Sequence, residues 1–330
     1  MMERLPIRFC GTGTYVPEHV LTNQHFAGYL DTSDEWIVTR TGIRERRRAG
    51  PGEYTSTLAA KASRLAMEDA GISNGEIDVI ICATATGDCP FPATAAFVQA
   101  SLGLKDVPAF DISAACAGFL YATVVAAGLL ASGLYKNALV IGAETLTRFA
   151  DKEDRRTVIL FGDAAGAAII SKTAGPEQGI LYCNMGCDGT RAEHIWVPAG
   201  GSRLPASETT VAERLHYMRM HGREVYKFAV TKMQELIKHA LTATGLTPDD
   251  LKLVIPHQSN LRIIESVRKR MELPPEKIAV NIDRFGNTSA ASVIMSLDEA
   301  RRDGTLQEGD LVLMIAIGAG LTWGVMIVRM

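Results

Sequence analysis

The sequence has no metal-site signature and no large excess of charge of either sign. Its six cysteines form no C-x-x-C pair, and no H-E-x-x-H occurs among its seven histidines, so their spacing indicates no metal site. The 34 basic and 37 acidic residues leave a formal net charge of −3. Because so small a charge recruits neither nucleic acid nor an anionic membrane, we expect neither partner, and any basic docking surface must be local.

The N-terminal segment MMERLPIRFCGTG also lacks an apolar run long enough for a secretory signal, so we expect a cytoplasmic protein with reduced thiols. Residues 112–135 carry no charge over a length that could cross a bilayer. They are rich in Ala, Gly and Ser, however, and the strand-like run ALVIGAE follows almost at once. A helix of this composition suits the packed centre of a large domain, so we expect no membrane segment.

The sequence does contain an internal repeat. GISNGEIDVIICATAT, which begins at Gly71, resembles GLTPDDLKLVIPHQSN, which begins at Gly245, at an offset of 174 residues. SAAC at residues 113–116 resembles SAAS at residues 289–292, at an offset of 176. Two matches in the same order at nearly equal offsets predict two copies of one α/β unit.

In each copy an amphipathic helix leads through a short turn into a buried strand, which predicts sheets covered on both faces. We therefore expect an α/β protein of five layers, αβαβα, with helices outside two sheets and small-residue helices between them. The two similar halves are placed at residues 1–172 and 173–330. Residues 173–223, with several Gly, Pro and Ser, are predicted to form an irregular excursion over one face, where substrates enter.

Cys116 stands between a strand-like run, VPAFDI, and the small-residue helix. A thiol at a helix N-terminus meets unpaired N–H groups, so this position predicts a lowered pKa and a nucleophile. The simpler alternative is that a small apolar Cys suits a crowded helix. The repeat argues against packing alone, because the counterpart of Cys116 at the offset of 176 is Ser292.

His257 follows the apolar run LKLVIP, at the C-terminal end of a strand, where α/β proteins place their sites. Asn287, in DRFGNTSAAS, precedes the helix that repeats the one after Cys116. From the residues alone Asn287 could simply cap that helix, but the relation between the two copies could also bring it close to Cys116. The basic run GIRERRR, residues 42–48, is either a solvated loop or the rim of a phosphate site.

Together, DISAACAGF, PHQSN and FGNTSAAS resemble the three catalytic signatures of β-ketoacyl-acyl carrier protein synthase III, a family with the thiolase fold. The similarity extends from DTSDEWIVTRTGIRERR to the closing GAGLTWG. It implies an acyltransferase of type II fatty acid biosynthesis that uses no cofactor. In this reaction Cys116 takes an acyl group from acyl-CoA, malonyl-acyl carrier protein loses CO2, and the resulting carbanion attacks the thioester to give β-ketoacyl-acyl carrier protein.

The resemblance also implies roles for individual residues. His257 and Asn287 would donate hydrogen bonds to the malonyl thioester oxygen, and the backbone N–H groups of Cys116 and Ala319 would hold the oxyanion of the acyl group. Trp36 and Arg155 would sandwich the CoA adenine. The full set implied is Thr32, Trp36, Arg40, Arg155 and Asn260 for CoA and pantetheine, Phe91 for the acyl pocket of a homodimer partner, and Lys227, Arg262, Lys269 and Arg270 for docking the acidic carrier protein.

Two other classes of function stay open from the sequence. A related thiolase-fold condensing enzyme of secondary metabolism, of polyketide or quinolone type, also uses Cys, His and Asn, although chain length and GIRERR favour the carrier-protein enzyme. A non-catalytic protein that keeps the fold is expected to have lost a catalytic residue, and here all three are present. The preferred primer acyl-CoA does not follow from the sequence.

Overall fold

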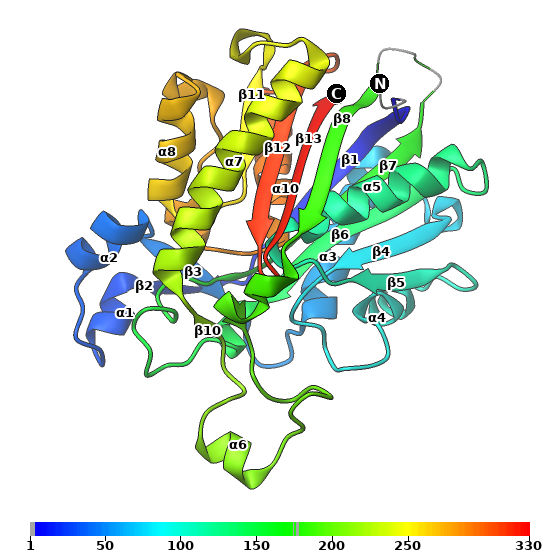
Figure 1. The fold of residues 1–330 in the computed structure, drawn as a ribbon. Helices are drawn as coiled ribbons and strands as arrows, with labels where there is room; N and C mark the ends of the chain where they lie inside the picture. Colours follow the sequence, from blue (N-terminus) through cyan, green and yellow to red (C-terminus); the bar gives the residue numbers. More distant parts are fainter. Residues whose placement is uncertain (1–3, 174, 176–177) are drawn as a thin grey trace.

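The computed structural model describes residues 4–173, 175 and 178–330, which form two β-sheets with helices outside and between them (Figure 1). The first sheet has the order β1-β7-β6-β4-β5, with β4 parallel to β5 and β6. Its strands are β1 (Ile7–Tyr15), β4 (Val79–Ala83), β5 (Ala109–Ile112), β6 (Asn137–Thr145) and β7 (Asp163–Lys172). The second has the order β11-β12-β13-β8, formed by β8 (Gly179–Cys187), β11 (Leu253–Pro256), β12 (Leu311–Gly318) and β13 (Thr322–Arg329).

Helices form the other three layers. The outer face of the first sheet is covered by α3 (Thr55–Ala70) and α4 (Thr94–Ser101), and that of the second by α7 (Gly222–Thr244) and α8 (Leu261–Arg270). Between the sheets lie α5 (Gly118–Ala131) and α10 (Ala291–Arg302) (Figure 1). The shorter elements are α1 (Asn23–Ala27), α2 (Asp34–Thr41), α6 (Glu208–Ala212), α9 (Ile282–Phe285) and the strand pairs β2 (His19–Thr22) with β3 (Glu45–Arg48) and β9 (Ile195–Trp196) with β10 (Arg219–Met220). The five-layered fold is confirmed.

The strands read as unbroken apolar runs because both faces of each sheet are buried. In β4, Val79, Ile81 and Ala83 pack against the central helices. The alternate side chains, Ile80 and Cys82, pack against α3 on the outer face. In α3 itself the buried residues recur at helical spacing, so one face of the helix meets the sheet.

The repeat appears in backbone geometry at an offset of 174 residues. Gly71 and Gly245 end α3 and α7 with left-handed φ angles of 65° and 70°, which glycine adopts without a steric cost. Ala115 and Ser289, also 174 residues apart, share positive φ angles of 45° and 48°. This offset makes Ala290 the counterpart of Cys116, so the pairing with Ser292 was wrong. Since Ala290 also lacks sulfur, the repeat still argues that packing alone does not require a cysteine at position 116.

Residues 173–223 are less irregular than predicted, because β8 lies within them and forms one edge of the second sheet. The segment after β8 consists of short elements, and α6 projects from the body of the molecule (Figure 1). The charge-free residues 112–135 are divided between the end of β5, a 3₁₀ turn and α5. Within the described part of the chain, no helix is long and apolar enough to cross a membrane.

The basic run at residues 42–48 is not simply a solvated loop, because part of it forms β3 and Arg46 is fully buried. The Arg46 guanidinium donates to the carbonyl oxygen of Leu21 at 3.1 Å, to Asn23 Oδ1 at 2.8 Å and to the carbonyl oxygen of Ile159 at 2.6 Å. It also lies over the ring of Phe26. For Arg46, neither a solvated loop nor a phosphate-binding rim is right: this side chain holds the β2–β3 ribbon against the segment that follows Arg155.

Candidate active site

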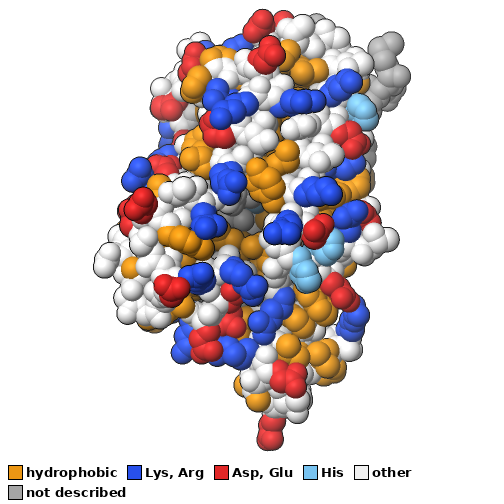
Figure 2. All heavy atoms as spheres, turned by 60° about the vertical axis from the view of Figure 1, so that its left-hand side comes forward, with side chains coloured by type: hydrophobic (Ala, Val, Ile, Leu, Met, Phe, Trp, Pro, Cys, Tyr) orange, Lys and Arg blue, Asp and Glu red, His pale blue; other side chains and the backbone are white. Residues whose placement is uncertain are grey.

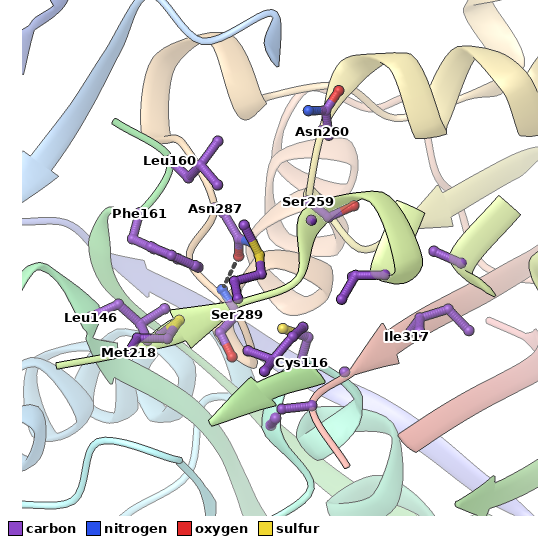
Figure 3. A pocket seen from close by; sticks show the side chains of 18 of the residues that line it. Cys116, Leu146, Leu160, Phe161, Met218, Ser259, Asn260, Asn287, Ser289 and Ile317 are labelled. Carbon is purple, nitrogen blue, oxygen red and sulfur yellow. Dashed lines mark hydrogen bonds between the residues drawn. The ribbon is translucent and has the colours of Figure 1, made fainter. Parts of the chain in front are cut away.

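A cavity of about 570 Å³ opens on the face of the molecule formed by α2, α7 and α8, where the surface is hollowed (Figure 2). Cys116, His257 and Asn287 all line it, so the structure brings the three predicted catalytic residues together from three separate segments. Figure 3 shows Cys116 and Asn287 at the cavity. Most of the remaining wall is apolar, and it includes Leu146, Phe161, Met218 and Ile317. Such a wall excludes water from the reacting groups and strengthens their electrostatic interactions.

Cys116 lies in the 3₁₀ turn Ala115–Ala117, directly before α5, and it lines the cavity. Burial raises the pKa of the Cys116 thiol to about 12. The nearby carboxylate of Glu144 adds to this rise, while the side chain of Ser289 opposes it. The predicted lowering of the pKa was therefore wrong, because loss of water disfavours the thiolate more than the helix terminus favours it. In the free protein the thiol is protonated, and its proton must leave as the sulfur attacks.

The end of β12 approaches the backbone of Cys116 closely. A Cβ atom added at Gly318 would lie 2.7 Å from the Cys116 nitrogen and 3.0 Å from the Ala114 carbonyl oxygen, so no other residue fits there without movement. The next residue, Ala319, lines the cavity, and its N–H donates to no other residue that the structure describes. The two backbone N–H groups thus lie at the same part of the wall, an arrangement suited to binding an oxyanion.

His257 directly follows β11 and is fixed by its backbone N–H, which donates to the carbonyl oxygen of Ile315 at 2.7 Å. Its ring is fully buried, and Nδ1 lies 2.7 Å from Oγ of Ser292. Nε2 has no hydrogen-bond partner among the described residues. Burial lowers the pKa of His257 from its ordinary 6.5 to about 3, so the ring is neutral and Nε2 is left for a ligand in the cavity.

The neutral state of His257 predicts how the malonyl decarboxylation implied by the family resemblance depends on pH. Because the pKa is lowered, the ring stays uncharged at every pH above about 3. We therefore expect a flat rate between about pH 8 and pH 5.5, with no fall as the pH drops through the ordinary histidine value. The measurement is CO2 release by protein acylated beforehand, which separates this step from the chemistry of Cys116. A single ionisation near pH 6.5 would contradict the expectation.

Asn287 is held by its backbone between two residues of the first half of the chain. Its N–H donates to the carbonyl oxygen of Leu160 at 2.8 Å, and its carbonyl oxygen accepts from Gly162 at 3.0 Å. Its side-chain Oδ1 accepts from the N–H of Ser289 at 2.9 Å (Figure 3). This bond leaves the Nδ2 amide free to donate into the cavity. Because α10 has Ala290 as its N-cap, the helix-capping alternative for Asn287 was wrong.

The residues predicted to bind CoA lie at or beside the same cavity. Trp36, Arg40 and Asn260 line it, whereas Thr32 and Arg155 do not. The Arg155 guanidinium carbon lies 5.1 Å from the centre of the Trp36 ring. A planar base between them needs two contacts of about 3.5 Å each, so Arg155 must move before the predicted sandwich can form. Arg155 also donates to the Asp31 carboxylate at 2.9 Å.

The other predicted site residues lie on the surface. Phe91, in the loop between β4 and α4, is 85% exposed and does not line the cavity of its own chain. The four predicted docking residues are all exposed: Lys227 on α7, and Arg262, Lys269 and Arg270 on α8. Figure 2 shows Lys and Arg side chains around the hollow on this face. The slightly negative chain thus has a local basic surface beside the cavity.

Several residues at the site were not found from the sequence. Leu146, Phe161 and Met218 come from three distant segments, and no spacing links them. Glu144 is fully buried, and its carboxylate accepts a hydrogen bond from the hydroxyl of Ser289 at 2.9 Å. It is joined there by the hydroxyls of two buried threonines, Thr84 and Thr86. Such a group is invisible in the sequence because its partners are 58 or more residues away.

Known proteins resemble this chain over its whole length. Two family models match, for 3-oxoacyl-[acyl-carrier-protein (ACP)] synthase III at residues 110–189 and for the C-terminal part of that enzyme at residues 241–330. The beta-ketoacyl-[acyl-carrier-protein] synthase III of Caldanaerobacter subterraneus subsp. tengcongensis is 49% identical over 329 residues, 100% of this chain and 99% of the relative.

Two solved structures show the same fold. The 3-oxoacyl-[acyl-carrier-protein] synthase III of Aquifex aeolicus superposes with a TM-score of 0.90 at 44% identity, covering 98% of this chain and 100% of the other. A priming β-ketosynthase from a polyketide biosynthetic pathway superposes with a TM-score of 0.90 at 35% identity, covering 99% and 97%. The fold and the resemblance predicted from the sequence are confirmed, and the chain belongs to the β-ketoacyl-acyl carrier protein synthase III family.

Proposed function

We propose that this chain is the initiating condensing enzyme of type II fatty acid biosynthesis, an acyltransferase that joins an acyl-CoA primer to malonyl-acyl carrier protein. One observation carries the proposal: a thiol, an unpartnered imidazole nitrogen and a free amide donor meet in one apolar cavity. These three groups suit a reaction in which a thioester forms on Cys116 and negative charge then develops on a second thioester, next to His257 and Asn287.

In the first half-reaction the Cys116 sulfur attacks the thioester carbon of acyl-CoA. The N–H groups of Cys116 and Ala319 stabilise the oxyanion that forms on the carbonyl oxygen. When this intermediate collapses, the bond between carbon and the CoA sulfur breaks, and the proton lost by Cys116 is balanced by the proton gained by the CoA thiol. The buried, protonated thiol makes proton loss part of this step.

In the second half-reaction malonyl-acyl carrier protein loses CO2, and the electrons of the broken bond form an enolate. Nε2 of His257 and Nδ2 of Asn287 donate hydrogen bonds to its oxygen. The carbanion end attacks the acyl carbon on Cys116, the new carbon–carbon bond forms, and the Cys116 sulfur leaves and regains a proton. Negative charge develops on the thioester oxygen as CO2 leaves, so these two neutral donors bind the transition state more strongly than the bound substrate.

The substrates enter from the hollowed face. Trp36 and Arg155 bind the adenine once Arg155 has moved, and Thr32, Arg40 and Asn260 line the pantetheine path. Asn260 is well placed for this because its side chain already joins α8 to α2, donating to the carbonyl oxygen of Arg40 at 3.1 Å. The acidic carrier protein docks on the basic residues of α7 and α8, Lys227, Arg262, Lys269 and Arg270.

We further propose that the enzyme is a cytoplasmic homodimer. Among the described residues β5 pairs only with β4, so it leaves an open sheet edge, and the exposed Phe91 lies in the loop that follows β4. A partner at this edge would receive Phe91 in its acyl pocket. Free thiols at Cys10, Cys82, Cys89, Cys116 and Cys187 suit a reducing compartment. The two halves are residues 1–172, with the nucleophile, and 173–330, with His257 and Asn287.

The test is a primer assay with purified protein. We expect acetyl-, isobutyryl- and longer acyl-CoA, each supplied with malonyl-acyl carrier protein, to give β-ketoacyl-acyl carrier protein with CoA and CO2 in equal amounts. A polyketide priming activity, named for a solved structure at 35% identity, is the less favoured alternative, because the beta-ketoacyl-[acyl-carrier-protein] synthase III relatives reach 49% and 51% identity over the whole chain. Supplying a fatty-acid carrier protein and a polyketide carrier protein in parallel separates the two. Condensation only on the polyketide carrier would replace the proposal.

A further inference from the structure

Ser292 lies behind the catalytic histidine and outside the set of cavity-lining residues. It is in the first turn of α10, is fully buried, and has its Oγ 2.7 Å from Nδ1 of His257. The proposed reaction assigns no role to it. A buried polar side chain in direct contact with a catalytic ring decides which of the two ring nitrogens carries the proton.

The hydrogen bonds around Ser292 determine that choice. The backbone N–H of Gln258 points at the same Oγ, at 3.4 Å, so the hydroxyl oxygen already serves as an acceptor. In the described part of the chain Ser292 Oγ has no other partner besides His257. The hydroxyl proton therefore has one acceptor available, which is Nδ1 of the neutral ring.

The opposite tautomer fits poorly. If Nδ1 carried the proton, Oγ would accept from both the ring and the Gln258 N–H, and the hydroxyl proton of Ser292 would be buried without an acceptor. Such an unmade hydrogen bond is costly in a buried site. In addition, Nε2 would present a lone pair to the cavity, and that lone pair would repel a developing enolate oxygen.

We propose that Ser292 is a positioning residue that donates to Nδ1 of His257 and so holds the ring in the tautomer with a proton on Nε2, aimed into the cavity. The inference rests on the proposed function, in which His257 donates to the enolate oxygen. Ser292 touches no substrate. It acts through His257, and its effect belongs to decarboxylation rather than to acylation of Cys116.

The functional test compares Ser292→Ala with a matched control. Ser296→Ala removes another buried hydroxyl from α10, one turn further on, whose Oγ donates only to the carbonyl oxygen of Ser292 at 3.1 Å. We expect Ser292→Ala to slow CO2 release from malonyl-acyl carrier protein by about 10-fold, because only the fraction of rings that keep a proton on Nε2 can donate to the enolate oxygen. Acylation of Cys116 by acetyl-CoA should change by less than about threefold, and Ser296→Ala should leave both rates close to wild type. Ser292→Thr, which keeps the hydroxyl, should restore CO2 release.

Nitrogen NMR measures the tautomer of the His257 ring directly and does not depend on an activity assay. Protonated and unprotonated ring nitrogens have well-separated shifts, and the His257 signals among those of the seven histidines are identified by their loss in His257→Gln. We expect the proton on Nε2 in the wild type and a mixture of tautomers in Ser292→Ala. A proton on Nδ1 in the wild type would overturn the inference, as would equal slowing of both half-reactions in Ser292→Ala. If the tautomer is as expected but His257→Ala still decarboxylates, the proposed role of His257 fails and the tautomer assignment stands.

Discussion

Replacing Cys116 with alanine is expected to abolish acyl transfer, with a loss on the order of 10⁴-fold or more. Cys116 is the one thiol in the cavity wall, and no second nucleophile of comparable strength lines the described part of that wall. The substitution removes one sulfur atom from a turn surrounded by alanines, so the fold should be kept. The measurement is the radioactivity that stays on the denatured protein after incubation with labelled acetyl-CoA.

Cys82→Ala is the matched control, since Cys82 is also buried but faces the outer layer from β4. This variant should lose a little stability and keep its self-acylation. Label retained on Cys116→Ala would mean that another residue accepts the acyl group, and the assignment of the nucleophile would have to be given up.

Replacing His257 or Asn287 with alanine is expected to separate the two half-reactions. Each change removes one hydrogen-bond donor from the enolate oxygen, which should slow decarboxylation by about 10²- to 10³-fold. Acylation of Cys116 should be partly kept, because the donors proposed for its oxyanion are different groups, the backbone N–H groups of Cys116 and Ala319. The two rates are measured on the same preparation, as label transfer from acetyl-CoA and as CO2 release from malonyl-acyl carrier protein.

A loss of stability alone would lower the rates of acylation and decarboxylation together. A control variant measures the size of this effect. Asn281 is buried and outside the cavity, and its side chain donates to Glu299 at 2.8 Å. Asn281→Ala should therefore weaken the fold without separating the half-reactions. Equal losses of acylation and decarboxylation in His257→Ala and Asn287→Ala would contradict the proposed division of roles.

Most of the fold could be predicted because its pattern is local and occurs twice. The helix that ends at Gly71 and the strand after it have the same order of elements as the helix that ends at Gly245 and its strand. The unbroken apolar runs of β12 and β13 indicate strands buried on both faces. The strand β8 was not predicted, because the sequence before residue 223 has an irregular composition. At the edge of its sheet, β8 is only partly buried and so needs fewer apolar residues than a central strand.

The sequence predicted three residues, Cys116, His257 and Asn287, that the structure brings to one cavity, but their surroundings could not be predicted from it. The signatures around Cys116, His257 and Asn287 point to the proposed catalytic groups, whereas the pKa of a thiol depends on how much water the whole fold removes from it. The contact between Ser292 and His257 joins residues 35 positions apart, on different elements. The role of Arg46 was missed for the same reason, because a basic run has the same composition whether its side chains are solvated or buried.

The backbone hydrogen bonds between Asn287 and the segment from Leu160 to Gly162 have a consequence for how a new chain becomes an enzyme. They join the segment that leads into β7, in the first sheet, to the backbone of Asn287, whose side chain is one of the two proposed donors. Cys116 comes from one half and His257 from the other, so neither half holds a complete set of reacting groups. The first turnover of a newly made chain therefore reports that its two sheets have docked, and catalytic activity serves as a measure of assembly as well as of chemistry.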